Sequence, residues 1–259
     1  MHRRDFLQLS MLGSVGLALS ANGVRASAQT ATRKILIAGG NYGTPFIRYM
    51  AALTGKQRPK LLYLPTASAD GATGTIAWFK SCAPLDVQPL AQDSFIASSR
   101  QTQSWEEVLL SVDGIVASGG NTLNQQAIWK AQGIDVLLKQ AWDRGIVLGG
   151  ASAGSLCWFE EGTTDSRPQR LTTVQCLGFL KGSHCPHYDR EPDRRPLYKK
   201  LIAAGEMKPG YACDNDAGIY FEDNEVKRVV ASRAGARVYH VTAVAGEAVE
   251  RLLEPTLLD

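Results

Sequence analysis

Residues 146–157 read Ile-Val-Leu-Gly-Gly-Ala-Ser-Ala-Gly-Ser-Leu-Cys, and this stretch decides the fold. The apolar run 146–148 has no polar alternation, which indicates a strand buried on both faces. It leads into Gly150-Ala-Ser-Ala-Gly154, the G-x-S-x-G pattern of a sharp turn from a strand into a helix. Two glycines let such a turn fold back without Cβ clashes, so the pattern predicts an exposed, reactive hydroxyl on Ser152. A small-residue turn without chemistry would have the same composition, so other parts of the chain must distinguish the two.

The chain before this turn alternates short apolar strands with helices. We expect strands at 34–38, 60–64, 86–90 and 114–118, and helices at 44–53, 75–80, 105–110, 123–131 and 134–144. Such alternation is typical of βαβ units, and it predicts a three-layer α/β/α sandwich around a mainly parallel sheet. Ligand sites in these sheets lie at the carboxyl ends of the strands. That edge would carry Gly39-Gly40, Pro65-Thr66, Gly119-Gly120-Asn121 and Ser152.

After the turn the pattern changes to shorter strands, expected at 218–221, 227–232 and 237–242. Glu160 and Glu161 are expected to end the helix that follows Ser152, and a polar turn is expected around Asp165. No linker and no internal repeat interrupts the chain. We therefore expect a single catalytic domain over residues 29–259.

The N-terminus predicts export. Arg3-Arg4 precedes a weakly apolar run over 9–19 and the small residues Ala26-Ser27-Ala28. These are the three regions of a signal peptide, and the run is too short to span a bilayer. The twin arginines indicate the export route for folded proteins. We expect residues 1–28 to be a twin-arginine signal peptide and the mature protein to be periplasmic or secreted.

Composition limits the functions of the mature chain. Residues 1–28 hold three arginines and one aspartate, so 25 basic and 24 acidic side chains remain. A nearly neutral chain without a basic run argues against nucleic-acid binding, and no later apolar stretch is long enough for a membrane helix. Five cysteines without a C-x-x-C pair predict neither a disulfide framework nor a zinc site. We expect no metal and no cofactor, a small peptide as substrate, and a monomer or homodimer.

An activated serine needs a base. Three histidines remain after residue 28, namely His184, His187 and His240. His187 is the expected base, because it follows a proline in a polar loop downstream of Ser152. His184 is its competitor, and His240 is expected to be structural, within a strand.

The base needs an orienting group, and the oxyanion of a tetrahedral intermediate needs N–H donors. Asp165 is the expected acid, since it lies in a polar turn between the serine and the histidines, whereas Asp189 is too close to His187 in sequence to reach it well. The amide of Ala153 is one expected oxyanion donor, and Gly120 is the other. The Gly-Gly-Asn-Thr turn could also cap a helix through Asn121 or Thr122, and both roles are compatible.

Four motifs together carry a family resemblance: Ala117-Ser-Gly-Gly-Asn-Thr122, Gly150-Ala-Ser-Ala-Gly154, the turn at Asp165, and Cys185-Pro-His-Tyr-Asp189. In order and spacing the chain resembles the dipeptidase E/cyanophycinase family of serine peptidases over about residues 34–232. The resemblance implies a fold like that of class I glutamine amidotransferases, with serine in place of their cysteine. It implies the same nucleophile, base, acid and oxyanion donors as the residues themselves indicate.

The resemblance also implies a substrate. Proteins similar to dipeptidase E cleave dipeptides that begin with aspartate, and an arginine after the histidine loop holds that side chain. Here Arg194 is the candidate, with Arg195 as the alternative, and Asn121 is a further candidate contact to substrate. A guanidinium pairs with a carboxylate through two hydrogen bonds, which suits this role. Two solvated arginines at a helix start remain an equal alternative.

We therefore expect a serine exopeptidase that hydrolyses small peptides, Asp-X dipeptides first, through a Ser-His-Asp triad and an acyl-enzyme. A cyanophycinase-like hydrolase of β-Asp-Arg substrates and a non-catalytic binding protein on the same scaffold are the alternatives. An α/β-hydrolase esterase is disfavoured, because Asp165 and His187 follow Ser152 too closely. Glutaminase chemistry is disfavoured because serine replaces the thiolate.

Overall fold

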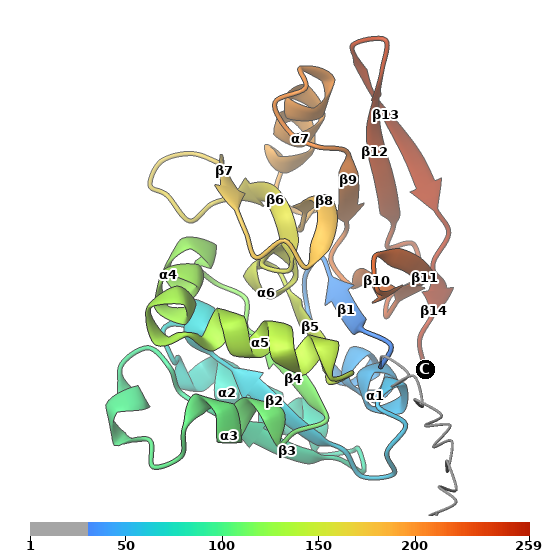
Figure 1. Cartoon of the computed structure of the whole chain (residues 1–259). Coiled ribbons are helices and arrows are strands. Elements are labelled where there is room, and N and C mark those ends of the chain that lie inside the picture. The colour runs from blue at the N-terminus through green and yellow to red at the C-terminus, as the bar shows by residue number, and fades with distance from the viewer. Residues whose placement is uncertain (1–30) are drawn as a thin grey trace, which may run out of the picture.

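The computed structural model describes residues 31–259, so the predicted signal peptide over residues 1–28 lies outside the described residues. An eight-stranded sheet with the order β14-β11-β10-β1-β5-β4-β2-β3 forms the centre of the molecule (Figure 1). Its strands are β1 (Lys34–Ala38), β2 (Lys60–Leu64), β3 (Gln88–Ala91), β4 (Gly114–Ala117), β5 (Val147–Ala151), β10 (Ala217–Glu222), β11 (Glu225–Ala231) and β14 (Thr256–Leu257). Strands β1 to β5 are parallel, and β10 is antiparallel to β1. The expected mainly parallel sheet is confirmed.

Helices cover both faces of this sheet. The helices are α1 (Thr44–Leu53), α2 (Ala72–Cys82), α3 (Trp105–Leu110), α4 (Thr122–Gln132) and α5 (Ile134–Asp143), with short 3-10 turns η1 (Thr66–Ser68) and η2 (Ala97–Arg100). Successive side chains of a strand point to opposite faces. In β1, Ile35 and Ile37 pack in the core beside α3, α4 and α5, whereas Leu36 packs with Phe46 of α1 and Trp78 of α2. The apolar runs without alternation therefore reflect burial on both sides, as expected.

A second, six-stranded sheet was not foreseen. Its order is β13-β12-β9-β8-β6-β7, and it stands above the central sheet in Figure 1. Its strands are β6 (Phe159–Thr164), β7 (Thr172–Gln175), β8 (Leu180–Cys185), β9 (Gly210–Cys213), β12 (Val238–Val244) and β13 (Glu247–Leu253), and α7 (Arg194–Ala203) packs against it. His240 lies within β12, so its predicted place in a strand is confirmed.

The expectation that Glu160 and Glu161 end a helix is wrong. The helix after Ser152, α6 (Ala153–Leu156), is only one turn long, and both glutamates lie in β6. Glu160 accepts a hydrogen bond from the Gly182 N–H (2.8 Å). Glu161 is buried and accepts one from the Lys208 N–H (2.8 Å). These long-range partners allow two carboxylates to occupy a strand.

Aromatic side chains join the second sheet to the helices of the first. Trp129 of α4 lies 5.9 Å from Trp158, and Phe179 stacks on Trp142 of α5 at 5.4 Å (centroid distances). Trp158 and Phe179 are themselves in contact. This buried row holds the start of the second sheet above the carboxyl edge of the first.

Two further properties concern the described part of the chain. Between residues 31 and 259 there is no helix that is both long and apolar enough to cross a membrane. All five cysteines lie in this range, and none of them forms a disulfide.

Candidate active site

Ser152 stands at the carboxyl edge, between β5 and α6. Its backbone has φ 58° and ψ −122°, a conformation that residues with a Cβ rarely adopt. Such strain costs on the order of 1–3 kcal/mol, and strained residues are common at active sites, ligand clamps and switch regions. Within residues 31–259, the Ser152 hydroxyl has no hydrogen-bond partner. The turn thus presents a half-buried, unengaged hydroxyl at the edge where ligands bind in such sheets.

Both glycines of the turn are required by close packing. A Cβ on Gly150 would lie 2.5 Å from the carbonyl oxygens of Ala117 and Gly154, and φ at Gly150 is +147°. A Cβ on Gly154 would lie 2.1 Å from the Ala117 oxygen. These distances are shorter than any side chain can tolerate, so the G-x-S-x-G spacing reflects the sharp turn that it predicted.

His187 is held on the same strand end as Ser152. It follows β8 in a loop and has φ 55°. Its backbone N–H donates to the Gly39 carbonyl (3.2 Å), and the Ser152 N–H donates to the Ala38 carbonyl (3.4 Å). Consecutive carbonyls at the end of β1 therefore anchor the serine and the histidine.

The ring of His187 is oriented by Asn215. Its Nδ1 lies 2.7 Å from Asn215 Oδ1. An amide oxygen only accepts, so Nδ1 carries the proton and Nε2 keeps a free lone pair, as a general base requires. A Cβ on Gly40 would come within 2.8 Å of His187 Cε1 and 2.4 Å of Asn215 Oδ1, so both side chains lie directly against this glycine.

A charged network fixes the turn that carries Asn215. The Asn215 N–H donates to Asp189 Oδ1 (2.7 Å). Arg233 binds Asp189 (3.1 Å) and Asp216 (2.9 Å), and Asn41 also donates to Asp216 (2.7 Å). Burial raises the pKa of Asp216, but the hydrogen bonds from Asn41 and Arg233 prevail and lower it below its ordinary value. The network keeps the backbone on either side of Asn215 in place.

Backbone amides for an oxyanion lie on two sides of Ser152. Gly119 is close to the serine, since a Cβ on it would lie 3.3 Å from Ser152 Cβ and 3.8 Å from Oγ. Gly120 follows with φ +133°. Among the described residues, no hydrogen-bond acceptor is found for the N–H groups of Gly119, Gly120 or Ala153. The expected donors Gly120 and Ala153 are thus unengaged, and Gly119 is an additional candidate.

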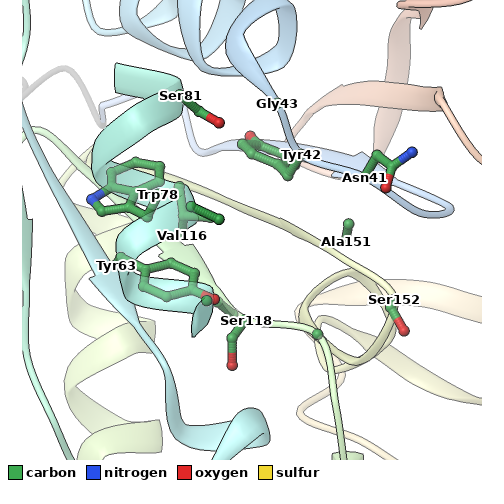
Figure 2. Close-up of a pocket in the computed structure, with 14 residues that line it drawn as sticks. Asn41, Tyr42, Gly43, Tyr63, Trp78, Ser81, Val116, Ser118, Ala151 and Ser152 are labelled. Atoms are coloured by element: carbon green, nitrogen blue, oxygen red, sulfur yellow. The ribbon is translucent and has the colours of Figure 1, made fainter. Parts of the chain in front are cut away.

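A pocket of about 420 Å³ opens beside Ser152 on the α1 and α2 side of the sheet. Figure 2 shows Tyr63 and Trp78 along one side, Tyr42 across from them, and Ser152 at one end. No Asp, Glu, Lys, Arg or His is among the residues that line it. Its volume is typical of small-ligand sites.

Comparisons with known proteins identify the family of this chain. The model of peptidase family S51 matches residues 35–229. The chain belongs to peptidase family S51. A protein of Bacillus subtilis (strain 168) described as an uncharacterized peptidase, YgaJ, is 39% identical over 203 residues, which cover 78% of this chain and 86% of that protein. The chain is accordingly a serine-type peptidase.

Solved structures share the fold of this S51 peptidase. A peptidase from an acI-B1 actinobacterium superposes with a TM-score of 0.65 at 15% identity, covering 86% of this chain and 95% of that one. A putative peptidase E protein from Listeria monocytogenes EGD-e gives 0.57 at 20% identity, covering 76% and 97%. The predicted resemblance to dipeptidase E and the predicted fold class are confirmed.

The structure of the S51 peptidase does not bring Asp165 to His187. Nδ1 of that histidine faces Asn215, and Asp165 instead lies 3.5 Å from Arg194 Nη2, with its side chain 64% exposed. The reason is the unexpected strand β6, which carries the chain into the second sheet before Asp165. The partner of His187 lies in the polar turn Asp214-Asn215-Asp216 after β9. The sequence shows this turn, but it follows His187 in the chain and carries an amide where an acid was expected, so Asn215 was not predicted.

His184 is excluded as the base by its surroundings. It is fully buried, its Nδ1–H donates to the Tyr211 carbonyl (2.9 Å), and its Nε2 lies 2.9 Å from Ser155 Oγ. Burial lowers the pKa of His184 to about 3, so the ring is neutral. The pKa of half-buried His240 is also lowered by burial, and its ring packs on Tyr211. His187 is the histidine that the structure places at the edge.

Arg194 is not free to bind an acidic substrate. It is 2% exposed, and its guanidinium donates to Glu191 (2.6 Å) and to the Thr163 carbonyl (3.0 Å). Arg195 is bound through two hydrogen bonds to Glu250 (3.0 and 2.6 Å). Neither arginine lines the pocket beside Ser152. The expected substrate contact through Arg194 or Arg195 is therefore not supported.

Asn121 has a structural role that the sequence analysis left open. Its side chain caps α4 by accepting from the Asn124 N–H (2.9 Å) and donates to the Ser166 carbonyl (3.1 Å). Both ends of the amide are engaged, so the helix-cap role is confirmed. A contact from the Asn121 side chain to substrate is not supported.

Proposed function

We propose that this S51 peptidase hydrolyses small peptides by acyl transfer through Ser152, His187 and Asn215. Ser152 Oγ attacks the peptide carbonyl carbon while His187 Nε2 takes the hydroxyl proton. His187 then gives this proton to the departing amine. Water, deprotonated by the same nitrogen, then attacks the acyl carbon. The ester bond to Ser152 breaks, and His187 returns this proton to Ser152 Oγ. Asn215 keeps the imidazole in the tautomer and orientation that these transfers need.

The oxyanion of each tetrahedral intermediate would be stabilised by backbone N–H groups. Ala153 offers one donor from the start of α6, and the Gly119-Gly120 turn offers the other. Preorganised donors of this kind contribute about 3–4 kcal/mol each to transition-state stabilisation. Their lack of other partners within residues 31–259 supports this role.

One observation carries the proposal. A strained serine with an unengaged hydroxyl and a histidine with a fixed tautomer are anchored to adjacent carbonyls of β1. The combination of a strained serine with an oriented base favours turnover over binding alone. We also propose that the enzyme acts outside the cytoplasm, because residues 1–28 have the pattern of a twin-arginine signal.

The aspartate preference expected from the sequence is not part of this proposal. It depended on Arg194 or Arg195, and carboxylates hold both guanidinium groups. A β-Asp-Arg substrate would require acidic groups to bind its arginine, and no acidic residue lines the pocket beside Ser152.

A fluorophosphonate probe tests the nucleophile. We expect one covalent adduct, located on Ser152 by mass spectrometry, and loss of both labelling and peptide hydrolysis in Ser152→Ala. Ser111→Ala is the matched control, since Ser111 is exposed at the end of α3 and does not contact the Ser152 turn. Peptide hydrolysis by Ser152→Ala at the native rate would refute the proposal.

A further inference from the structure

The pocket beside Ser152 presents aromatic carbon, because the polar atoms of two of its rings are engaged elsewhere. Trp78 Nε1–H donates to the Leu90 carbonyl (3.1 Å), and the Tyr42 hydroxyl donates to the Leu36 carbonyl (3.3 Å). Tyr63 stacks on Trp78 with 5.5 Å between centroids. Figure 2 shows the indole nitrogen of Trp78 directed away from the pocket. The pocket walls are therefore largely apolar.

The residues that line the pocket carry no charge. No ionisable side chain other than tyrosine lines the pocket, and burial raises the pKa of both Tyr42 and Tyr63 above the ordinary value. Ser118 is 2% exposed, and the hydroxyl groups of Ser118 and Ser68 both lie beside that of Tyr63. The polar groups that line the pocket are therefore neutral, and none of them neutralises a carboxylate.

The position of the pocket decides which part of a peptide it receives. Along the sheet the strands follow the order β10, β1, β5, β4, β2. Ser152 stands at the end of β5, His187 is anchored on β1, and Gly119 follows β4 on the opposite side. The pocket is lined by Gly119 after β4 and also by Asn41, Tyr42 and Gly43 after β1. The leaving amine must face His187 to receive its proton, so the residue whose carbonyl lies against the Gly119-Gly120 turn has its side chain next to the pocket.

We infer that this pocket binds an uncharged, apolar or aromatic side chain of the residue that acylates Ser152. This inference rests on the proposed function and names its substrate class. Burying a side chain as large as Phe or Leu there should favour it over Ala by roughly tenfold to a hundredfold in kcat/KM. A carboxylate would lose its hydration without gaining a partner, so Asp should be the poorest residue at this position.

Dipeptides that differ in their residues or in the order of the two residues test the inference. We expect Phe-Ala and Leu-Ala to be hydrolysed faster than Ala-Ala, and Asp-Ala slowest. Phe-Ala should also exceed Ala-Phe, which places the ring on the acyl side. Equal or faster hydrolysis of Asp-Ala, or a preference for Ala-Phe, would overturn the inference and leave the serine mechanism intact.

A charge placed in the pocket wall sharpens the test. Ser81 lines the pocket from α2, and Ser81→Arg should lower kcat/KM for Phe-Ala about tenfold and raise it for Asp-Ala. Ile76→Arg is the matched control, because Ile76 lies on the same helix, is 54% exposed and does not line the pocket. The same substrate profile in the two variants would contradict the inference.

Measurements of peptide binding test this inference independently of the proposed function. Calorimetry on Ser152→Ala measures affinity for the same peptides without turnover. Tighter binding of Phe-Ala than of Asp-Ala supports the pocket assignment even if the native enzyme hydrolyses neither peptide, an outcome that would refute the proposed function alone. Equal affinities, or a preference for Asp-Ala, would refute the pocket assignment.

Discussion

Two serine–histidine combinations lie close together in this molecule, and they differ in almost every physical respect. Ser155 follows Ser152 by one helical turn, and His184 precedes His187 by three residues. The inner side chains, Ser155 and His184, are both fully buried and lie 2.9 Å apart. The outer residues, Ser152 and His187, have half-buried side chains at the sheet edge, and the backbone φ of each is positive.

The comparison teaches that residue type alone does not identify a catalytic group. The inner histidine is neutral and enclosed, so it has no route to substrate. Ser155 Oγ also lies 2.8 Å from the Ser152 carbonyl oxygen, which ties the inner residues to the strained turn. We infer that the inner residues hold the turn while the outer ones carry out the chemistry.

The largest expected difference between the two combinations is in the effect of replacing each histidine. His187→Ala should lower kcat on the order of 10³-fold or more, because a general base contributes about 10²–10⁴-fold and orients the nucleophile as well. His184→Ala should mainly lower the melting temperature. Initial rates and thermal unfolding of both variants provide the measurement. An inactive His184→Ala that unfolds like the native enzyme, beside an active His187→Ala, would reverse the assignment.

Removing Asn215, the group that orients His187, should have a smaller effect on kcat. Asn215→Ala should lower kcat roughly tenfold to a hundredfold, because a hydrogen bond of about 1–3 kcal/mol that fixes the base is lost. Asp165→Ala is the control and should stay within a few-fold of native, since Asp165 is exposed and faces Arg194. Steady-state kinetics compare the two. A greater loss in Asp165→Ala would restore the aspartate as the orienting acid.

The inner serine should affect stability more than rate. Ser155→Ala leaves His184 Nε2 buried without its partner, which should cost about 1–3 kcal/mol of unfolding free energy. Urea denaturation measures this value, with Ser111→Ala as an exposed serine-to-alanine control. An unchanged unfolding free energy would show that the inner hydrogen bond does not support the turn.

Acid should weaken the fold through His184. Its pKa is about 3 in the folded enzyme and about 6.5 when unfolded, so the unfolded chain binds the extra proton between these values. The unfolding free energy should therefore fall as pH decreases from 6.5, by up to about 1.4 kcal/mol per pH unit. Glu160, whose pKa is lowered to about 2 by the Gly182 N–H and by Lys208, adds a loss only below about 4.5.

The interval from pH 6.5 to 5 lies above the range in which Glu160 contributes, and His240, whose pKa is also lowered by burial, adds to the slope there. Chemical denaturation at several pH values in this interval measures the slope, and His184→Gln should reduce it. A slope that is the same in native enzyme and in His184→Gln would exclude His184 as its source.

Much of the central sheet could be predicted because its signals are local. Strands β1, β2, β4 and β5 are apolar runs between turn residues, and helix α1 begins and ends at the predicted residues. The turn at Ser152 follows from glycine sterics alone. Strand β6 could not be predicted, because its sequence Phe-Glu-Glu-Gly-Thr-Thr becomes a strand only through partners such as Gly182 and Lys208, which lie far along the chain.

The partner of His187 was missed for a similar reason. Asn215 is placed by a bridge to Gly40, which is 175 residues away, and by the pairing of β10 with β1. Arg194 was expected either to bind the substrate or to be solvated at a helix start, but Glu191 and the end of β6 enclose it. Contacts between distant segments determine the positions of Asn215 and Arg194, and no local sequence pattern indicates these contacts.

The single strand β1 has a consequence for how the enzyme is made. Ser152, His187 and Asn215 attach to its last carbonyl of Ala38 and to the two glycines that follow it, and β1 itself is enclosed between β5 and β10. A chain leaving the ribosome holds β1 almost from the start, yet it lacks its second neighbour until residue 222 has been made. We therefore expect the peptidase to become active only near the end of its synthesis, and β1 to be an edge strand until β10 has been made.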